Sequence, residues 1–185
     1  MNQDKDYSSG KHKSVQPELG EWLNSFSAHL QIKPHNNRID YPESFAKGFA
    51  KVYDVEPGLT YRIADYQLYT NYVSTRSPSD KFFLIIYFYQ YTNCGKLLVS
   101  INDEVIINND EPNYSTLLMT NSLASHHIEV SSGACVKGLT IQLSEDWLKE
   151  KIKHAATAKY ILFKQKNFFQ RFFNCQNTKV AERDF

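Results

Sequence analysis

The sequence lacks the features that mark common catalytic and membrane classes. It has only seven glycines in 185 residues, and none stands in the G-x-G-x-x-G or G-x-x-x-x-G-K-[ST] spacing of a phosphate-binding loop. No nucleophile elbow, Cys-x-x-Cys or His-Glu-x-x-His occurs. The longest apolar run, Phe82–Tyr89, is far shorter than the ~20 residues of a membrane-spanning helix. The signatures of motif-bearing enzymes and of helical membrane anchors are therefore missing.

Paired cysteines and an excess of one charge are also missing. Cys94, Cys135 and Cys175 lie about 40 residues apart, without the spacing of a disulfide framework or a zinc knuckle. The 21 Lys and Arg against 20 Asp and Glu give a net charge of +1, so no global field attracts nucleic acid or a membrane surface. The start of the chain has no apolar segment of the secretory type. We predict a cytoplasmic protein without a membrane partner.

Aromatic residues are abundant, at 14% of the chain with 12 Tyr and 12 Phe, and they favour strands. Turn clusters divide the region from Arg38 to Leu143 into short runs rich in β-branched and aromatic residues. The runs are Leu59–Tyr72, Lys81–Tyr91, Lys96–Ile107, Tyr114–Met119, His126–Val130 and Cys135–Leu143. These indicate at least six strands without long intervening helices, in antiparallel sheets closed into a sandwich or barrel.

The two ends of the chain have a different character. Residues 1–16 are polar and predict a disordered leader, and the spacing of Trp22, Phe26 and Leu30 predicts a short helix that opens a domain over residues 17–143. Residues 144–185 predict a helical segment that begins with Ser144 as N-cap. From residue 149 onward nine Lys or Arg stand against three acids, a local charge of +6.

Phenylalanines recur in this basic tail at helical spacing, which indicates packing more than stacking on nucleic-acid bases. We predict a dimerisation or interdomain helix, and as candidate dimerisation residues we name Phe168, Phe169, Phe172 and Phe173.

Two strands carry the candidate binding residues. The run Lys81–Tyr91 is apolar or aromatic on both faces, so we expect both faces to be covered, by helices, a pocket or a partner subunit. In the run Leu59–Tyr72 an arginine shares one face with tyrosines, a combination that can bind a carboxylate or sugar oxygens. The alternative is a solvated face with amphipathic tyrosines. The predicted ligand-binding residues are Arg62, Tyr66, Tyr72, Tyr87 and Tyr89.

The sequence His126-His127-x-Glu129 is the best candidate for a metal site. Adjacent side chains of a strand point to opposite faces, so the two histidines cannot bind one ion, and His127 with Glu129 lacks the third ligand that a metal needs. We therefore predict no metal and no cofactor.

One stretch resembles a known family. Residues 137–149 (KGLTIQLSEDWLK) carry the last predicted strand into a helix. Together with the short helix around Trp22 and the β-rich middle, this layout resembles the N-terminal sensor half of bacterial AraC-type transcription regulators. The resemblance implies a cupin-like antiparallel β-barrel (a double-stranded β-helix, or jelly roll) that binds a small effector, such as a sugar or a small organic acid. It also implies following helices that form a homodimer.

Such regulators read DNA through two helix-turn-helix units, for which the chain after Leu143 is too short. We therefore expect a non-enzymatic sensor and dimerisation domain that contacts DNA only through a domain absent from this chain. Two alternatives remain open. One is a cupin-type metal-dependent enzyme that binds its metal through His127 and Glu129. The other is a free-standing small-molecule binding protein.

Overall fold

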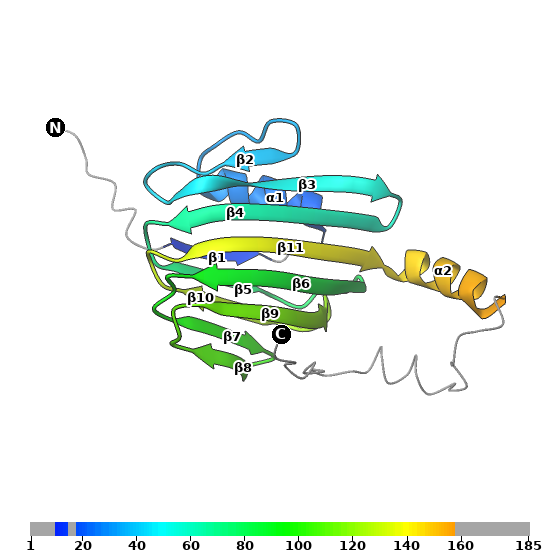
Figure 1. The fold of residues 1–185 in the computed structure, drawn as a ribbon. Helices are drawn as coiled ribbons and strands as arrows, with labels where there is room; N and C mark the ends of the chain where they lie inside the picture. The colour runs from blue at the N-terminus through cyan, green and yellow to red at the C-terminus, as the bar shows by residue number, and fades with distance from the viewer. Residues whose placement is uncertain (1–9, 15–17, 158–185) are drawn as a thin grey trace.

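The computed structural model describes residues 10–14 and 18–157, which form two facing β-sheets and two helices (Figure 1). In order, the five-stranded sheet contains β1 (Gly10–Ser14), β5 (Tyr72–Arg76), β10 (His126–Val130), β7 (Leu97–Ile101) and β8 (Glu104–Asn109). The six-stranded sheet contains β2 (Arg38–Asp40), β3 (Ala46–Glu56), β4 (Leu59–Leu68), β11 (Cys135–Ser144), β6 (Phe83–Thr92) and β9 (Tyr114–Asn121). The paired strands are antiparallel except β1 and β5. The prediction of a mainly β protein is confirmed.

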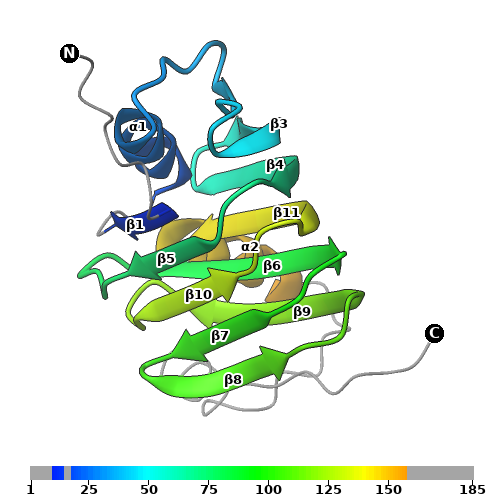
Figure 2. The same cartoon turned by 90° about the vertical axis from the view of Figure 1, so that its left-hand side faces the viewer.

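Helix α1 (Leu19–His29) is the predicted N-terminal helix, and it lies beside β1 (Figure 2). Leu19, Leu23 and Phe26 fall on one face and are buried against the sheets. The side chain of Glu18 at the N-cap makes no capping hydrogen bond. Instead, the first amide of the helix, at Leu19, donates to Oε1 of Gln142 on β11 at 2.9 Å. A long-range side chain thus fixes the start of α1 against the six-stranded sheet.

Two predicted strands are each divided in two. The run Leu59–Tyr72 breaks after Leu68, because the chain crosses there from one sheet to the other, and it resumes as β5. The run Lys96–Ile107 folds back on itself as β7 and β8 through a turn at Asn102 and Asp103. Both turn residues have positive φ (49° and 63°), as a two-residue hairpin requires.

Three strands, β1, β2 and β3, were not predicted. The buried positions of β3 are Ala46, Ala50 and Val52, side chains too small to give a strong hydrophobic pattern. Strand β1 corrects the expectation of a disordered leader over residues 1–16, since residues 10–14 pair with β5. Main-chain pairing of this kind needs no apolar side chains, which is why a polar segment can adopt it. Residues 1–9 and 15–17 lie outside the described residues.

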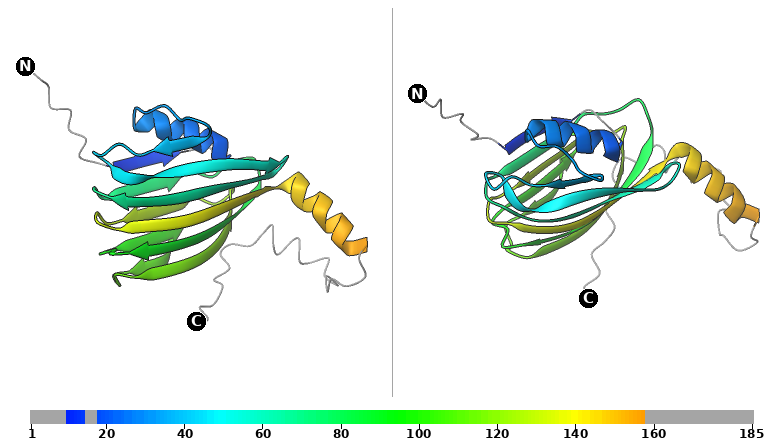
Figure 3. Two further views of the ribbon diagram at one scale, coloured as in Figure 1. Left: turned by 45° about the horizontal axis from the view of Figure 1, so that its top comes forward. Right: turned by 90° about the horizontal axis from the view of Figure 1, so that it is seen from above.

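Helix α2 (Glu145–Thr157) continues directly from β11 and extends away from the sheets (Figure 3). The hydroxyl of Ser144 accepts a hydrogen bond from the amide of Trp147 at 3.2 Å, as an N-cap does. Nε1 of Trp147 donates to Glu56 at 2.6 Å, which joins the first turn of α2 to the end of β3. The predicted stripe Phe168–Phe173 lies outside the described residues. Neither described helix combines the length and the hydropathy needed to cross a bilayer.

The outer face of the six-stranded sheet carries a row of apolar side chains across four strands. Ile63, Leu139, Phe88 and Leu117 are cross-strand neighbours in that order. Phe88 is 42% exposed, and Ile63 and Leu117 are exposed to a similar extent. The expectation that both faces of Lys81–Tyr91 are covered therefore holds for the inner face but not for Phe88 within the part of the chain that the structure describes.

Candidate ligand-binding cavity

The inner faces of the two sheets enclose a cavity of ≈ 120 Å³. Strands of both sheets contribute to its wall, and α1 adds Leu19, Trp22 and Phe26. The remaining wall combines apolar side chains with polar ones that point inward. The polar and tyrosine side chains are Tyr41, Arg62, Tyr66, Tyr72, Ser74, Arg76, Tyr87, Tyr89, Tyr91, Thr116, His126, Thr140 and Gln142. A cavity of this size holds on the order of ten water molecules, and so accommodates a small organic molecule.

All five residues predicted to bind a ligand line this cavity: Arg62, Tyr66, Tyr72, Tyr87 and Tyr89. The alternation of side chains places Arg62 and Tyr66 on the inner face of β4, and Tyr87 and Tyr89 on the inner face of β6. Tyr72 reaches the cavity from the opposite sheet, as the first residue of β5. The alternative of a solvated face does not hold for Arg62 and Tyr66, because that face of β4 forms the cavity wall. That they bind a ligand remains a prediction.

Arg62 of β4 is held by neutral groups. Its Nη2 donates to the hydroxyl of Tyr89 at 2.6 Å and to Oγ1 of Thr140 at 3.1 Å. The guanidinium carbon lies 4.1 Å from the centroid of the Trp22 ring of α1, a cation–π contact. Its Nε is buried and has no hydrogen-bond partner among the described residues.

Arg76 ends β5 on the other side of the cavity and is also held by neutral groups. Its Nη2 donates to the main-chain oxygens of Asn121 and Ala124, at 2.9 and 3.2 Å. Its Nη1 donates to the hydroxyl of Tyr87 at 3.4 Å. Its Nε is buried without a partner in the described part of the chain. Arg76 thus anchors the β9–β10 loop and adds a second positive charge to the cavity.

His126 of β10 is the register partner of Arg76 and stacks on the ring of Tyr87, with centroids 5.3 Å apart. Burial lowers the pKa of His126 to about 3, with a smaller contribution from the positive charge of Arg76. The imidazole is therefore neutral at physiological pH and can donate one hydrogen bond and accept another.

The buried tyrosines of the cavity are neutral as well. Burial raises the pKa of Tyr41, Tyr66, Tyr72 and Tyr91 above the ordinary tyrosine value. Their hydroxyls stay protonated, so they supply hydrogen bonds but no negative charge.

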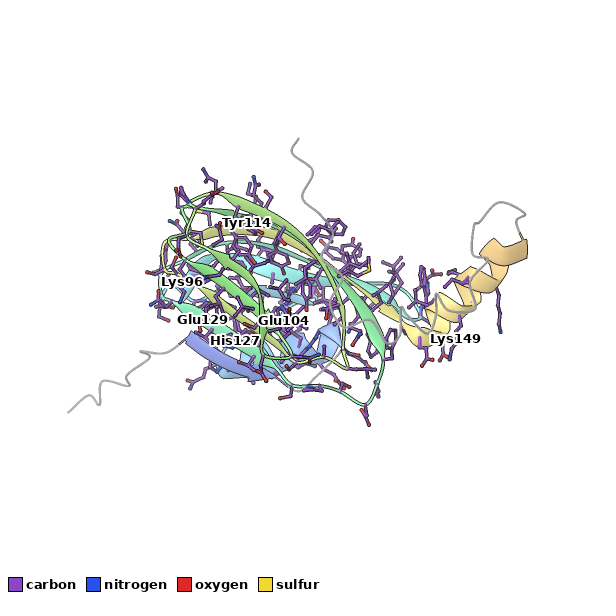
Figure 4. The ribbon with its side chains drawn as sticks, turned by 90° about the horizontal axis from the view of Figure 1, so that it is seen from below. Lys96, Glu104, Tyr114, His127, Glu129 and Lys149 are labelled. Carbon is purple, nitrogen blue, oxygen red and sulfur yellow. The ribbon has the colours of Figure 1, made fainter. Side chains whose placement is uncertain are left out.

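The candidate metal pair lies outside the cavity. His127 and Glu129 point away from the wall that His126 and Ile128 line, as strand alternation predicts (Figure 4). Nε2 of His127 donates to Glu129 at 3.0 Å, and its Nδ1 is 3.1 Å from Oγ1 of Thr75. Lys96 pairs with the same carboxylate at 3.4 Å. Within the described ranges no group of three His, Cys, Asp or Glu could hold a metal ion.

Sequence reasoning missed Arg76, His126 and Trp22 as cavity residues. Arg76 follows Tyr72 and Ser74 at alternate positions, so extending the inward face by two steps would have found it. The motif around His126 indicates either a metal site or two ordinary strand histidines, and neither interpretation places His126 in a cavity. Trp22 and Arg62 are 40 positions apart in the sequence, so no local sequence pattern could predict their contact.

Comparison with known proteins adds little. No protein-family profile matches the chain, and no curated protein matches its sequence. Among solved structures it is similar to an ensemble-refined structure of the plu4264 protein from Photorhabdus luminescens. The similarity has a TM-score of 0.34 and 14% identity, and it covers 59% of this chain and 85% of that one. At this level the similarity supports no argument about function.

Proposed function

We propose that this chain is the effector-binding domain of an AraC-type transcription regulator, which binds a small molecule in the cavity between its sheets. In this proposal the sheets form a cupin-like barrel, and the domain relays binding to helix-turn-helix units outside this chain. The protein acts in the bacterial cytoplasm and is not an enzyme.

The observation that carries the proposal is the continuity of the cavity wall with α2. Thr140 and Gln142 line the cavity on β11, and the same strand enters α2 after Ser144. A ligand that contacts β11 therefore acts on the root of α2 without an intervening loop. Gln142 also holds the start of α1, so both helices are attached to one strand of the wall.

The proposal includes a homodimer formed through Phe168, Phe169, Phe172 and Phe173. Its support is the helical spacing of these residues, which follow α2 in the chain.

Hydrogen exchange with and without a ligand found by thermal-shift screening of sugars and small organic acids tests the proposal. For a sensor, ligand should slow amide exchange both in β11 around Thr140 and in the first turn of α2. The variant Trp147→Phe loses the hydrogen bond from Trp147 to Glu56. In this variant the ligand should slow amide exchange less in α2, while its effect on exchange in β11 should be the same as in the wild type.

Protection confined to the cavity strands, with α2 unchanged, would favour the free-standing binding protein. Failure of every compound to raise the unfolding temperature would count against a ligand-binding function. No described feature favours the metal-dependent enzyme, since both ring nitrogens of His127 already face partners.

A further inference from the structure

The described lining residues of the cavity include two guanidinium groups and no carboxylate. Arg62 and Arg76 both line it, whereas no Asp or Glu occurs among its described lining residues. Arginine stays protonated in proteins, so both groups carry a full positive charge. This excess is local, because the chain as a whole has a net charge of only +1.

The groups that hold the two arginines do not neutralise them. Every hydrogen-bond acceptor of Arg62 and Arg76 is a hydroxyl or a main-chain oxygen. The described ion pairs of the protein lie elsewhere, on exposed or half-exposed side chains. Arg38, for comparison, meets Asp40 at 2.6 Å on the surface. Among the described residues, therefore, the exposed Arg38 has a carboxylate partner, whereas Arg62 and Arg76 in the cavity have none.

Such an arrangement is unfavourable for folding alone. A buried charge costs free energy unless it is paired, and a buried N–H without an acceptor adds to that cost. In the part of the chain that the structure describes, neither Nε atom has a hydrogen-bond partner. Burial is the largest cause of the low pKa of His126, and the charges of Arg76 and Arg62 lower that pKa further. A negatively charged ligand would supply the counter-charge that the two arginines lack among the described residues.

The two cations are connected through one strand. Tyr89 accepts from Arg62 and Tyr87 from Arg76, and the two tyrosine rings of β6 lie 6.1 Å apart. The rest of the cavity wall is aromatic and apolar, with Tyr66, Tyr72 and Leu118 among its residues. A ligand that fits this wall has one charged end and a flat or apolar body.

Phosphate-binding sites commonly present free main-chain N–H groups at a helix N-terminus. The only helix start that reaches this cavity among the described elements is that of α1, where the amide of Leu19 is already bonded to Gln142. A planar guanidinium can bind a carboxylate through two parallel hydrogen bonds without any main-chain amide. The cavity therefore suits a carboxylate better than a phosphate.

We propose that the cavity binds a small carboxylic acid, whose carboxylate is recognised by Arg62 with Arg76 as second cation and whose apolar body lies against the tyrosines. This inference rests on the proposed function and narrows its ligand to an anion of roughly ten non-hydrogen atoms. The bound carboxylate accepts N–H groups of the guanidinium that the protein leaves unused. Neutral sugars leave the two charges uncompensated and are excluded as the effector.

Benzoate and benzamide test the proposal, because they share size and shape and differ in charge. Thermal unfolding and calorimetric titration are measured on the wild type, Arg62→Gln, Arg76→Gln and the control Arg38→Gln. Benzoate at about ten times its Kd should raise the unfolding temperature of the wild type and of Arg38→Gln by roughly 3–6 °C. Benzamide should have no effect, and Arg62→Gln should bind benzoate at least tenfold more weakly, since it loses a charge-assisted bond.

The ligand-free variants supply a second, independent measurement. If Arg62 serves a ligand, Arg62→Gln should unfold at the wild-type temperature or above it, because it removes an uncompensated charge. A fall of several degrees would make Arg62 a structural residue and overturn the proposal, as would equal binding of benzoate and benzamide or no binding of benzoate. A neutral compound that binds and protects α2 would overturn the anion proposal while leaving the sensor function intact.

Discussion

At the residue scale, His126 experiences the same positive field that a ligand would meet. Arg76 on β5 and Arg62 on β4 lie close enough to affect it, His127 follows it on β10, and Tyr87 of β6 stacks on its ring. No carboxylate among the described lining residues offsets them. Burial is the largest cause of the low pKa of His126, and the neighbouring positive charges lower that pKa further.

This gives a pH prediction. The pKa of His126 is about 3 in the folded protein against an ordinary 6.5, so between these values the unfolded chain takes up a proton that the folded protein does not. The free energy of unfolding should therefore be fully retained above pH 6.5 and fall as the pH is lowered toward 3. Urea unfolding at about pH 7.5 and about pH 5 measures the loss, which should be smaller in His126→Gln. The substitution does not change His127 or Glu129, which form a pair at 3.0 Å in the wild type. Equal losses would show that His126 is not held neutral.

The sequence predicts that Arg62 and Tyr66 share a face of one strand, but not that this face points into the cavity. Strand alternation places these residues on one face, but the sequence has aromatic residues on both faces and so does not say which face is inner. Arg76 and His126 come from strands of the opposite sheet, and only the packing of the two sheets brings them to the cavity. The missing information was thus long-range.

At the element scale, β11 is shaped to receive an aromatic ring. Gly138 lies between Ala64 and Tyr89 of the neighbouring strands, and a Cβ atom at this glycine would overlap the ring of Tyr89. The glycine thus lets Tyr89 lie across the strand, where its hydroxyl reaches Arg62 at 2.6 Å. Gly138, although a glycine within a strand, therefore helps to hold Arg62 in place through Tyr89.

Gly138→Ala should lower the free energy of unfolding by about 1–3 kcal/mol, because the methyl group displaces Tyr89. Gly20→Ala in α1 is the matched control. A Cβ there meets nothing within 4 Å, so the change should stabilise the helix by roughly 0.5–1 kcal/mol. Urea midpoints measure both. Wild-type stability in Gly138→Ala would mean that Tyr89 does not rest on this glycine.

Strands with bulky alternating residues were predictable, and strands defined by small residues or by pairing alone were not. Sequence patterns gave β6, β9, β10 and β11 within a few residues, whereas β3, with its buried alanines, was missed. The sequence pattern also could not show that β4 and β5 belong to different sheets, because a crossing between sheets changes no local periodicity.

At the scale of the whole molecule, positive charge is concentrated in the C-terminal residues, and exposed apolar side chains gather on one face of the six-stranded sheet. Residues 149–185 carry +6, so with a total of +1 the preceding 148 residues carry −5. The exposed row Ile63, Phe88 and Leu117 lies on the outer face of the six-stranded sheet. Contiguous exposed apolar side chains are typical of surfaces that contact another molecule.

Replacing Phe169 and Phe172 together by Asp should convert a dimer into a monomer of 21.5 kDa, because two charges cannot be buried in an apolar interface. Light scattering coupled to size-exclusion chromatography measures the mass. Val55→Asp, at an exposed position of β3, is the control and should leave the mass unchanged. A dimer that survives both Asp substitutions would place the interface on another surface.

The direct passage of β11 into α2 has a mechanical consequence. The 13 residues of α2 form a rod of about 20 Å that is rooted at Ser144, only two residues beyond Gln142 in the cavity wall. A tilt of roughly 10° at that root displaces the far end of a rod of this length by about 3 Å. If the protein is the proposed regulator, the strand–helix junction would act as a lever arm, because a small tilt at Ser144 would become a larger displacement at the far end of α2.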